Sequence, residues 1–147
     1  MRRVVRALCG GLMLVWVLLA GVSANAQPAP AERPAAVPAD AKKVKSLVPT
    51  SPASITAGSL LFQKYCKFCH GASGKGDSPM APKTMHPSNL TDAEWTRGSS
   101  DGEIFWVIQN GAPPKYDMKG LKAKLSDQDI WNLVNYVRSL GSVTKSH

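Results

Sequence analysis

Two thiols and an imidazole fall within five consecutive residues of this 147-residue chain, in the stretch Cys66-Lys67-Phe68-Cys69-His70. Such a group could form a disulfide, act as a redox pair, ligate a metal ion or anchor a prosthetic group. A thioredoxin-like redox pair needs a helix start within a βαβ pattern, which the flanking sequence does not show. A structural zinc site needs four ligands, and the only other histidines are His86 and His147. A disulfide suits an oxidising compartment but leaves His70 unexplained.

The order Cys-x-x-Cys-His is the attachment signature of c-type haem. Cysteines at i and i+3 lie about one helical turn apart and can reach both vinyl edges of one porphyrin, while the next residue turns its imidazole beneath the iron. We therefore expect Cys66 and Cys69 to carry the thioether bonds of one covalently bound haem c, and His70 to ligate its iron. The tight turn beside the macrocycle would use the glycines that follow, Gly71, Gly74 and Gly76.

Helices must position these residues, because the apolar residues recur at helical spacing and no segment alternates apolar and polar residues as a half-buried strand would. Helical segments are expected at residues 54–66, 91–98, 99–111 and 125–141. Ser54 or Thr56 is expected to cap the first of them, and Ser100 with Glu103 has capping-box spacing in the third.

Two long segments, 71–90 and 110–125, show no obvious secondary structure. Loops of that length are unusual in a domain of about 90 residues, whose core is small. Both observations are explained if the loops wrap around a large, flat, apolar group at the centre of an all-α domain.

The rest of the chain divides by composition. Residues 1–26 read as a signal peptide, with an arginine-rich start, an uncharged run and Ala24-Asn25-Ala26 as the cleavage site. Residues 27–52 are rich in proline and alanine and predict a flexible tether. The domain is expected over 53–142, followed by a short tail, 143–147. Loss of the three arginines of the signal peptide leaves 15 basic and 10 acidic residues, a net charge of +5. No basic stripe alternates with aromatic residues, so no nucleic-acid partner is expected.

Residues 53–141 resemble a class I cytochrome c of the bacterial monohaem type, on the motifs CKFCHG, DGEIFWVIQNG and LSDQDIWNLVNYVRSLG. The resemblance implies a small all-α fold of three to five helices, with long loops wrapped around one covalently attached haem. It implies that the first and last helices cross, with Gly58 and Phe62 against the face around Tyr136. It also implies that the backbone at Pro79 accepts the proton of the haem-binding histidine.

In this family the sixth iron ligand is a methionine in the loop before the last helix, which implies Met118 here. Lys119 stands where many relatives have proline. The alternatives are an open site or one of three earlier residues, Met80, Met85 and His86. A histidine and methionine pair saturates the iron, and methionine raises the reduction potential.

We therefore expect an exported, periplasmic electron-transfer protein, not an enzyme, that shuttles single electrons between a redox donor and a redox acceptor. Four lysines cluster near the ligand methionine: Lys115, Lys119, Lys122 and Lys124. This cluster could attract the acidic docking face of a redox partner. One alternative is a haem-bearing subunit of a larger dehydrogenase or oxidase complex, through which the protein would associate with a membrane. The other is a five-coordinate haem sensor or peroxidase-like protein.

Overall fold

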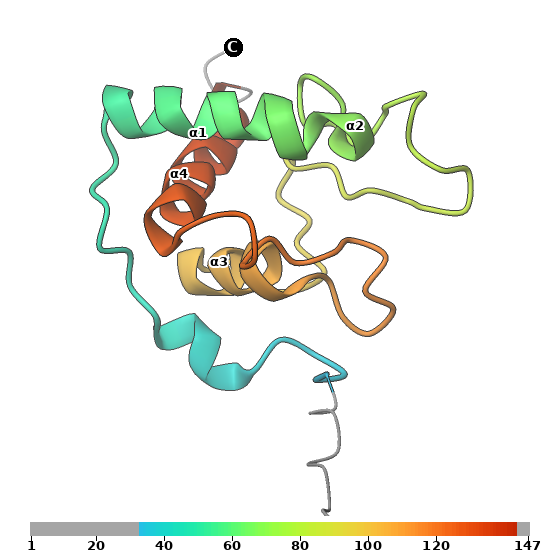
Figure 1. Cartoon of the computed structure of the whole chain (residues 1–147), viewed down its shortest axis with the longest axis horizontal. Coiled ribbons are helices and arrows are strands. Elements are labelled where there is room, and N and C mark those ends of the chain that lie inside the picture. The colour runs from blue at the N-terminus through green and yellow to red at the C-terminus, as the bar shows by residue number, and fades with distance from the viewer. Residues whose placement is uncertain (1–32, 144–147) are drawn as a thin grey trace, which may run out of the picture. The chain divides into compact units, whose positions relative to one another are not determined.

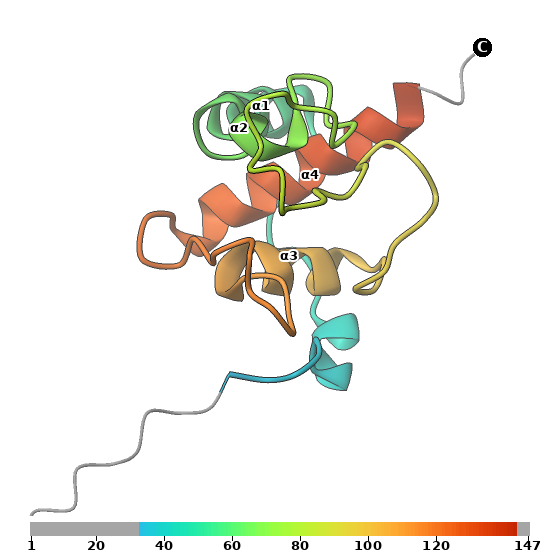
Figure 2. The same ribbon diagram turned by 90° about the vertical axis from the view of Figure 1, so that its right-hand side faces the viewer.

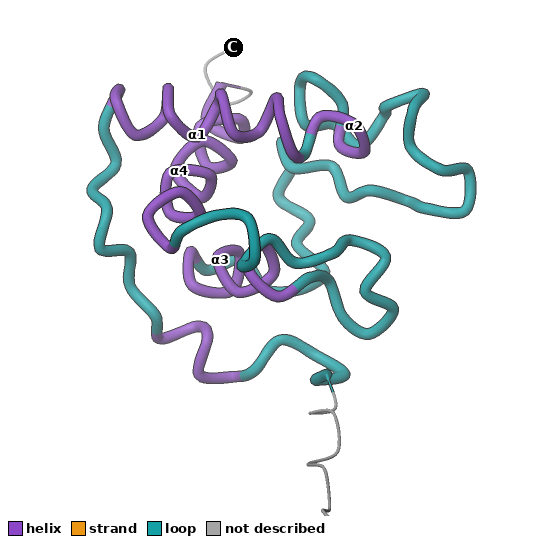
Figure 3. Tube along the Cα trace, in the orientation of Figure 1, coloured by secondary structure: helices purple, strands orange, loops and turns teal. Residues whose placement is uncertain are grey.

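Helices form the architecture of residues 33–143, the part of the chain that this computed structural model describes. In chain order they are the 3₁₀ turn η1 (Ala39–Lys43), α1 (Pro52–Tyr65), α2 (Lys67–His70), α3 (Asp101–Asn110) and α4 (Asp127–Val143) (Figure 1). The described residues contain no strand (Figure 3). An isolated bridge joins Gly111 and Lys119. The all-α fold expected from the sequence is therefore confirmed, whereas the expected signal peptide lies outside the described residues.

The start of α1 lies earlier than the sequence predicts. Ser51 is the N-cap, and its hydroxyl accepts from the backbone N–H of Ser54 at 3.1 Å. Pro52 follows at the first helical position, where its missing N–H leaves no bond unmade. The prediction of a cap at Ser54 or Thr56 is wrong, because Ser54 is buried and its hydroxyl donates to Oδ1 of Asn132 at 2.7 Å.

Helix α4 lies between α1 and α3 and packs against both (Figure 2). Gly58 lets the backbone of α1 touch α4, since a Cβ atom there would overlap the carbonyl oxygen of Asn132 and come 2.8 Å from Cβ of Tyr136. Phe62 is fully buried, and its ring centroid lies 5.2 Å from that of Tyr136. This is the crossing that the resemblance implied. It fixes the end of α1, directly before Cys66.

Helix α3 begins at the predicted capping box. The Ser100 hydroxyl accepts from the N–H of Glu103 at 3.3 Å, and the Glu103 carboxylate accepts from the N–H of Ser100 at 2.9 Å. Farther along the helix, Phe105 stacks on Trp131 of α4 with ring centroids 4.2 Å apart. The helix is thereby fixed at its start by polar bonds and along its length by apolar packing.

No helix forms over residues 91–98, where the sequence predicts one. Side chains accept the backbone hydrogen bonds instead: Oδ1 of Asn89 accepts from the N–H of Thr91 at 2.9 Å, and Oδ1 of Asp92 accepts from the N–H of Glu94 at 3.0 Å. These local bonds offer the backbone an alternative to a short helix. The prediction is therefore wrong for this segment.

Residues 33–51, which we name the N-terminal strap, run along the helices, although their composition predicts a tether (Figure 1). The turn η1 lies against α3 with Ala41 buried, and a Cβ atom on Gly102 of α3 would overlap the Ala41 carbonyl oxygen. The Asn135 side chain of α4 hydrogen-bonds with Thr50 of the strap at 3.0 Å. A few such contacts, which average composition does not reveal, place this segment on the domain.

Candidate haem site

A cavity of about 400 Å³ lies among the helices, with walls from α1, α2, α3, α4 and both long loops. All four residues that the sequence predicts to serve a haem line it: Cys66, Cys69, His70 and Met118. Much of the remaining wall is apolar and comes from the helices: Phe62, Ile104, Val107, Ile108, Leu133 and Val137. The site therefore offers two sulfur attachment points, an imidazole and a thioether around an apolar space, which fits haem c.

His70 is buried, and its Nδ1 lies 3.0 Å from the carbonyl oxygen of Ser88. Because a carbonyl only accepts, Nδ1 carries the proton and Nε2 keeps its lone pair for a metal. Burial lowers the pKa of His70, and this effect outweighs the hydrogen bond to Ser88, which raises it. The imidazole is therefore held neutral, in the tautomer that an iron ligand needs.

The prediction that Pro79 supplies this acceptor is wrong. Gly76 packs directly on the backbone of Pro87 and Ser88, where a side chain would overlap the Pro87 carbonyl oxygen. The residues between these two points loop outward, and Pro79 is exposed. The chain returns to the His70 ring only at Ser88.

The two thiols form no disulfide with each other: Cys66 is the N-cap of α2, and Cys69 lies within this helix. The carbonyl oxygen of Cys66 accepts from the N–H of Cys69 at 3.1 Å and from the N–H of His70 at 2.9 Å. Burial raises the pKa of the Cys66 thiol to about 12, with the charge of Cys69 as a smaller cause. One helical turn therefore presents both thiols and the imidazole from the same element.

The turn after His70 uses the predicted glycines. Gly71, Gly74 and Gly76 have φ values of +78°, +77° and +74°, in the region that favours glycine. The N–H of Gly76 donates to the His70 carbonyl oxygen at 2.8 Å, which closes the turn. The backbone on both sides of His70 is thus fixed by hydrogen bonds.

Residues 111–120, which we name the methionine loop, carry Met118 into the cavity wall. The Met118 carbonyl oxygen accepts from the N–H of Ala112 at 3.0 Å, across the bridge between Gly111 and Lys119. Gly111 has a φ of +100°, and a Cβ atom there would come 2.7 Å from the Met118 carbonyl oxygen. A glycine is therefore required where the loop closes on itself.

Two of the alternative iron ligands also line the cavity, Met85 and His86, whereas Met80 is 60% exposed and does not. Met85 and His86 shortly precede Ser88, the hydrogen-bond acceptor of His70, in the same long loop. A second hollow of about 430 Å³ within residues 76–87 contains none of the four predicted site residues. Met118, which also lines the cavity, belongs to the methionine loop and not to this segment.

Sequence reasoning missed two residues of the cavity wall, Trp95 and Arg97. Arg97 donates from Nε to the carbonyl oxygen of Pro113 at 2.9 Å, which joins the 91–98 segment to the methionine loop. Arg97 is one of only two arginines between residues 53 and 142, the other being Arg138, and this rarity in a lysine-rich domain was an available signal.

Comparison with known proteins agrees with this geometry. The family model for cytochrome c matches residues 55–141, more than half of the chain. The chain belongs to the cytochrome c family. Its cofactor is therefore covalently attached haem c, and members of this family are typically electron carriers and not enzymes.

Two curated relatives are subunits of cbb3-type cytochrome c oxidases. This cytochrome c is 32% identical over 93 residues to subunit FixP of Rhizobium meliloti and 35% identical over 98 residues to subunit CcoP of Rhodobacter capsulatus. Each match covers 63% of this chain but only 30% and 31% of the respective relative. The chain thus spans less than a third of the length of these relatives.

Solved structures show the same fold. Cytochrome cL of Methylophaga aminisulfidivorans superposes with a TM-score of 0.55 at 26% identity, covering 74% of this chain and 70% of that chain. A chain of the reducing HAO-like complex Kustc0457/Kustc0458 of Kuenenia stuttgartiensis superposes with a TM-score of 0.57 at 23% identity, covering 69% and 54%. The helical arrangement around the cavity is therefore that of known c-type cytochromes.

Proposed function

We propose that the protein is an exported monohaem cytochrome c that shuttles single electrons between redox partners, with Cys66 and Cys69 bonded to the haem and with His70 and Met118 as axial ligands. The observation that carries the proposal is the convergence of these four side chains on one largely apolar cavity. The periplasm is the compartment in which the expected signal peptide would place a bacterial c-type cytochrome.

Bound haem supplies the one-electron chemistry, and the chain supplies the ligands and their surroundings. The Ser88 carbonyl oxygen fixes the ring orientation of His70 and the nitrogen that faces the metal. The thioether of Met118 favours the reduced state of iron. The wall is largely apolar, and Lys115 and Lys119 are exposed at its edge, where an acidic partner would approach from solvent.

The second candidate is a haem-bearing subunit of an oxidase complex, which the similarity to FixP and CcoP favours. No helix within residues 33–143 has the length and hydropathy for crossing a membrane. Purification from membranes of the source organism, under mild detergent, tests this role. Stoichiometric recovery with oxidase subunits supports the subunit, and recovery alone from the periplasmic fraction supports the free carrier.

Expression together with a haem-attachment system tests the main proposal. We expect a mass equal to the cleaved polypeptide plus one haem, and a ferric spectrum with the long-wavelength charge-transfer band of methionine-bound haem. Met118→Ala should remove that band and lower the reduction potential, because a thioether stabilises the reduced iron. Met80→Ala is the matched control, since its side chain lies in solvent.

Carbon monoxide separates this function from a five-coordinate sensor or peroxidase-like protein. A saturated iron binds the gas slowly at neutral pH in the parent and rapidly in Met118→Ala. Rapid binding in the parent, together with a Met118→Ala spectrum identical to that of the parent, would refute methionine ligation and support the five-coordinate alternative.

A further inference from the structure

The N-terminal strap contacts the methionine loop outside the cavity, through the side chain of Tyr116. We propose that the strap positions Met118: by holding Tyr116, residues 33 and 34 keep the loop closed and the methionine sulfur in the cavity. This inference rests on the proposed ligation by Met118. Tyr116 and the strap are positioning residues, because neither Tyr116 nor any strap residue lines the cavity.

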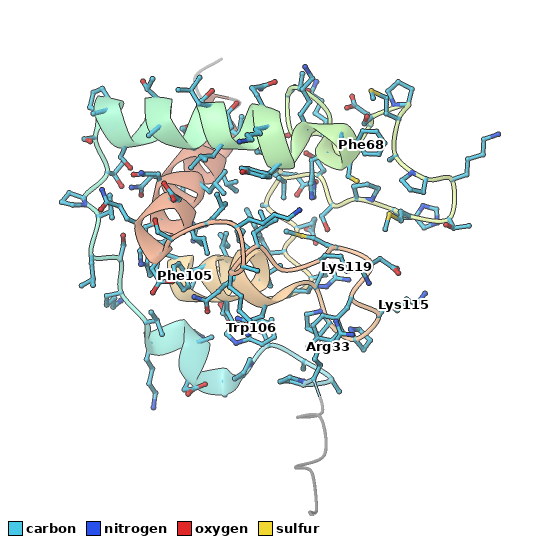
Figure 4. The ribbon with its side chains drawn as sticks, in the orientation of Figure 1. Arg33, Phe68, Phe105, Trp106, Lys115 and Lys119 are labelled. Atoms are coloured by element: carbon cyan, nitrogen blue, oxygen red, sulfur yellow. The ribbon has the colours of Figure 1, made fainter. Side chains whose placement is uncertain are left out.

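Tyr116 makes two contacts with the strap. Its hydroxyl donates to the carbonyl oxygen of Pro34 at 2.6 Å, and the guanidinium carbon of Arg33 lies 4.8 Å from the centre of its ring. The tyrosine is 6% exposed, whereas its partners Arg33 and Pro34 are exposed, so the contacts hold a buried side chain from the surface. Figure 4 shows Arg33 beside the loop that carries Lys115 and Lys119. A hydrogen bond and a cation–π contact thus act on one side chain of the loop.

The backbone of Tyr116 needs such contacts. Its φ of +56° makes it the one non-glycine residue with a positive φ within residues 33–143. Aromatic residues rarely adopt this left-handed conformation, and it persists where surrounding structure enforces it. The hydrogen bond to Pro34 and the contact with Arg33 supply that enforcement at this position.

The position of Tyr116 is coupled to that of Met118 through Ala112. The N–H of Tyr116 donates to the Ala112 carbonyl oxygen at 2.8 Å, and the N–H of Ala112 donates to the Met118 carbonyl oxygen at 3.0 Å. Both bonds use the peptide groups of one buried residue. Release of Tyr116 from the strap therefore loosens the backbone that carries Met118.

The strap is itself anchored away from the loop. The turn η1 packs on α3, where Gly102 leaves no space for a Cβ atom beside Ala41. Farther along, the Asn135 side chain of α4 donates to the Val48 carbonyl oxygen at 3.3 Å. The strap thus connects the methionine loop to two helices of the core. A substitution that displaces the strap from α3 or α4 should therefore loosen the backbone around Met118.

The first test measures how fast imidazole displaces the methionine from the ferric protein, followed by loss of the charge-transfer band. Tyr116→Phe keeps the ring and removes only the hydroxyl, and Arg33→Gln removes the guanidinium group above the ring but keeps a polar side chain. The matched controls are Tyr136→Phe on α4 and Lys45→Gln on the exposed part of the strap. Each test variant should exchange roughly two- to tenfold faster than the parent, the range expected for one hydrogen bond or cation–π contact. Rates equal to those of the controls overturn the proposal.

The second test uses Gly102→Ala, which touches neither Tyr116 nor Met118. The added methyl group should displace η1 and raise amide hydrogen exchange of residues 111–120 in the haem-loaded protein, in step with Tyr116→Phe. Parent-like protection of these residues in both variants overturns the proposal. Ligation by Met118 is tested separately, because it is refuted if Met118→Ala has the same absorption spectrum as the parent. In that case the hydrogen-exchange result still decides whether the strap holds the methionine loop.

Discussion

The backbone of Gly58 on α1 lies directly against the carbonyl oxygen of Asn132 on α4, so that no side chain fits between the two helices. This contact sets how closely α1 approaches α4. Because α1 runs straight into Cys66, the same contact sets where the thiols and the imidazole of α2 stand relative to the cavity. A packing residue of the core thus governs the geometry of the site.

Gly58→Ala should destabilise the haem-loaded protein by about 1–3 kcal/mol, because the added methyl group forces the helices apart. Gly141→Ala on α4 is the matched control: its Cβ atom would have the Thr91 carbonyl oxygen at 3.7 Å as its nearest neighbour, an ordinary contact. Chemical denaturation measures both. Equal stability of the two variants would contradict the role of Gly58.

A buried polar network joins the same helices, and the sequence did not indicate it. Nδ2 of Asn135 donates to the Ser54 hydroxyl at 2.8 Å, and Oδ1 of Asn135 accepts from the Thr50 hydroxyl at 3.0 Å. Asn135→Leu should cost about 1–3 kcal/mol of unfolding free energy, since polar partners are left unpaired. Gln128→Leu, on the exposed face of α4, should change it by less than about 0.5 kcal/mol.

A double-variant cycle sharpens this prediction. Ser54→Ala and Asn135→Leu should together cost less than the sum of the single costs, because both remove the same bond. Strict additivity would show that the bond between the two side chains contributes nothing to stability.

The capping box of α3 predicts a pH dependence of stability. Hydrogen bonds from the Ser100 hydroxyl and backbone N–H lower the pKa of Glu103, and the positive charge of Lys42 adds to this. A carboxylate with a depressed pKa in the folded state stabilises the fold above its unfolded pKa, near ~4.3, and this contribution disappears as the pH falls through the folded value.

Glu103→Gln should therefore melt below the parent at neutral pH, with the difference shrinking below about pH 4. Ser100→Ala should cost about 1 kcal/mol through loss of the cap, and in that background the Gln substitution should have a smaller effect. Thermal melts across the acid range measure the differences. A gap between parent and Glu103→Gln that is constant with pH would contradict the prediction.

Lys115 and Lys119 are exposed at the edge of the cavity and should attract anionic electron acceptors. Oxidation of the reduced protein by ferricyanide should be severalfold slower at low ionic strength in the double variant Lys115→Gln/Lys119→Gln, with the difference lost at high salt. Lys43→Gln/Lys45→Gln changes the net charge equally at exposed positions on the strap. Equal rates in the two double variants would place the steering charge elsewhere.

The sequence predicted the elements whose signals are local. The capping box at Ser100 and Glu103 and the glycines after His70 are confirmed. The crossing of α1 with α4, which the resemblance to class I cytochromes c implied, is confirmed as well. It failed where side chains accept the backbone hydrogen bonds of a segment, and where a hydrogen-bond partner is distant in the sequence. Residues 91–98 are not helical because side chains bond their backbone, and the partner of His70 is Ser88, 18 residues away, which no spacing rule indicates.

The sequence predicted the residues that would bind the haem better than it predicted the residues that hold them in position. Cys66, Cys69 and His70 are given by one motif, and all of them line the cavity with Met118. Arg97 comes from a segment for which the sequence predicted a helix, and the strap contacts come from one whose composition suggests only a linker. Neither contact was indicated, because a single hydrogen bond to a carbonyl oxygen leaves no trace in amino-acid composition.

The packing of residues 33–51 on the helices limits how far the chain can be shortened. Composition alone suggests that the chain could be shortened to residues 55–141, the stretch that the family model matches. That truncation would remove the hydrogen-bond partner of Tyr116 and expose the side of α3 at Gly102 that η1 covers. It would also remove the hydrogen bonds of Asn135 to Thr50 and Val48. A shortened version of this protein should therefore begin no later than Arg33.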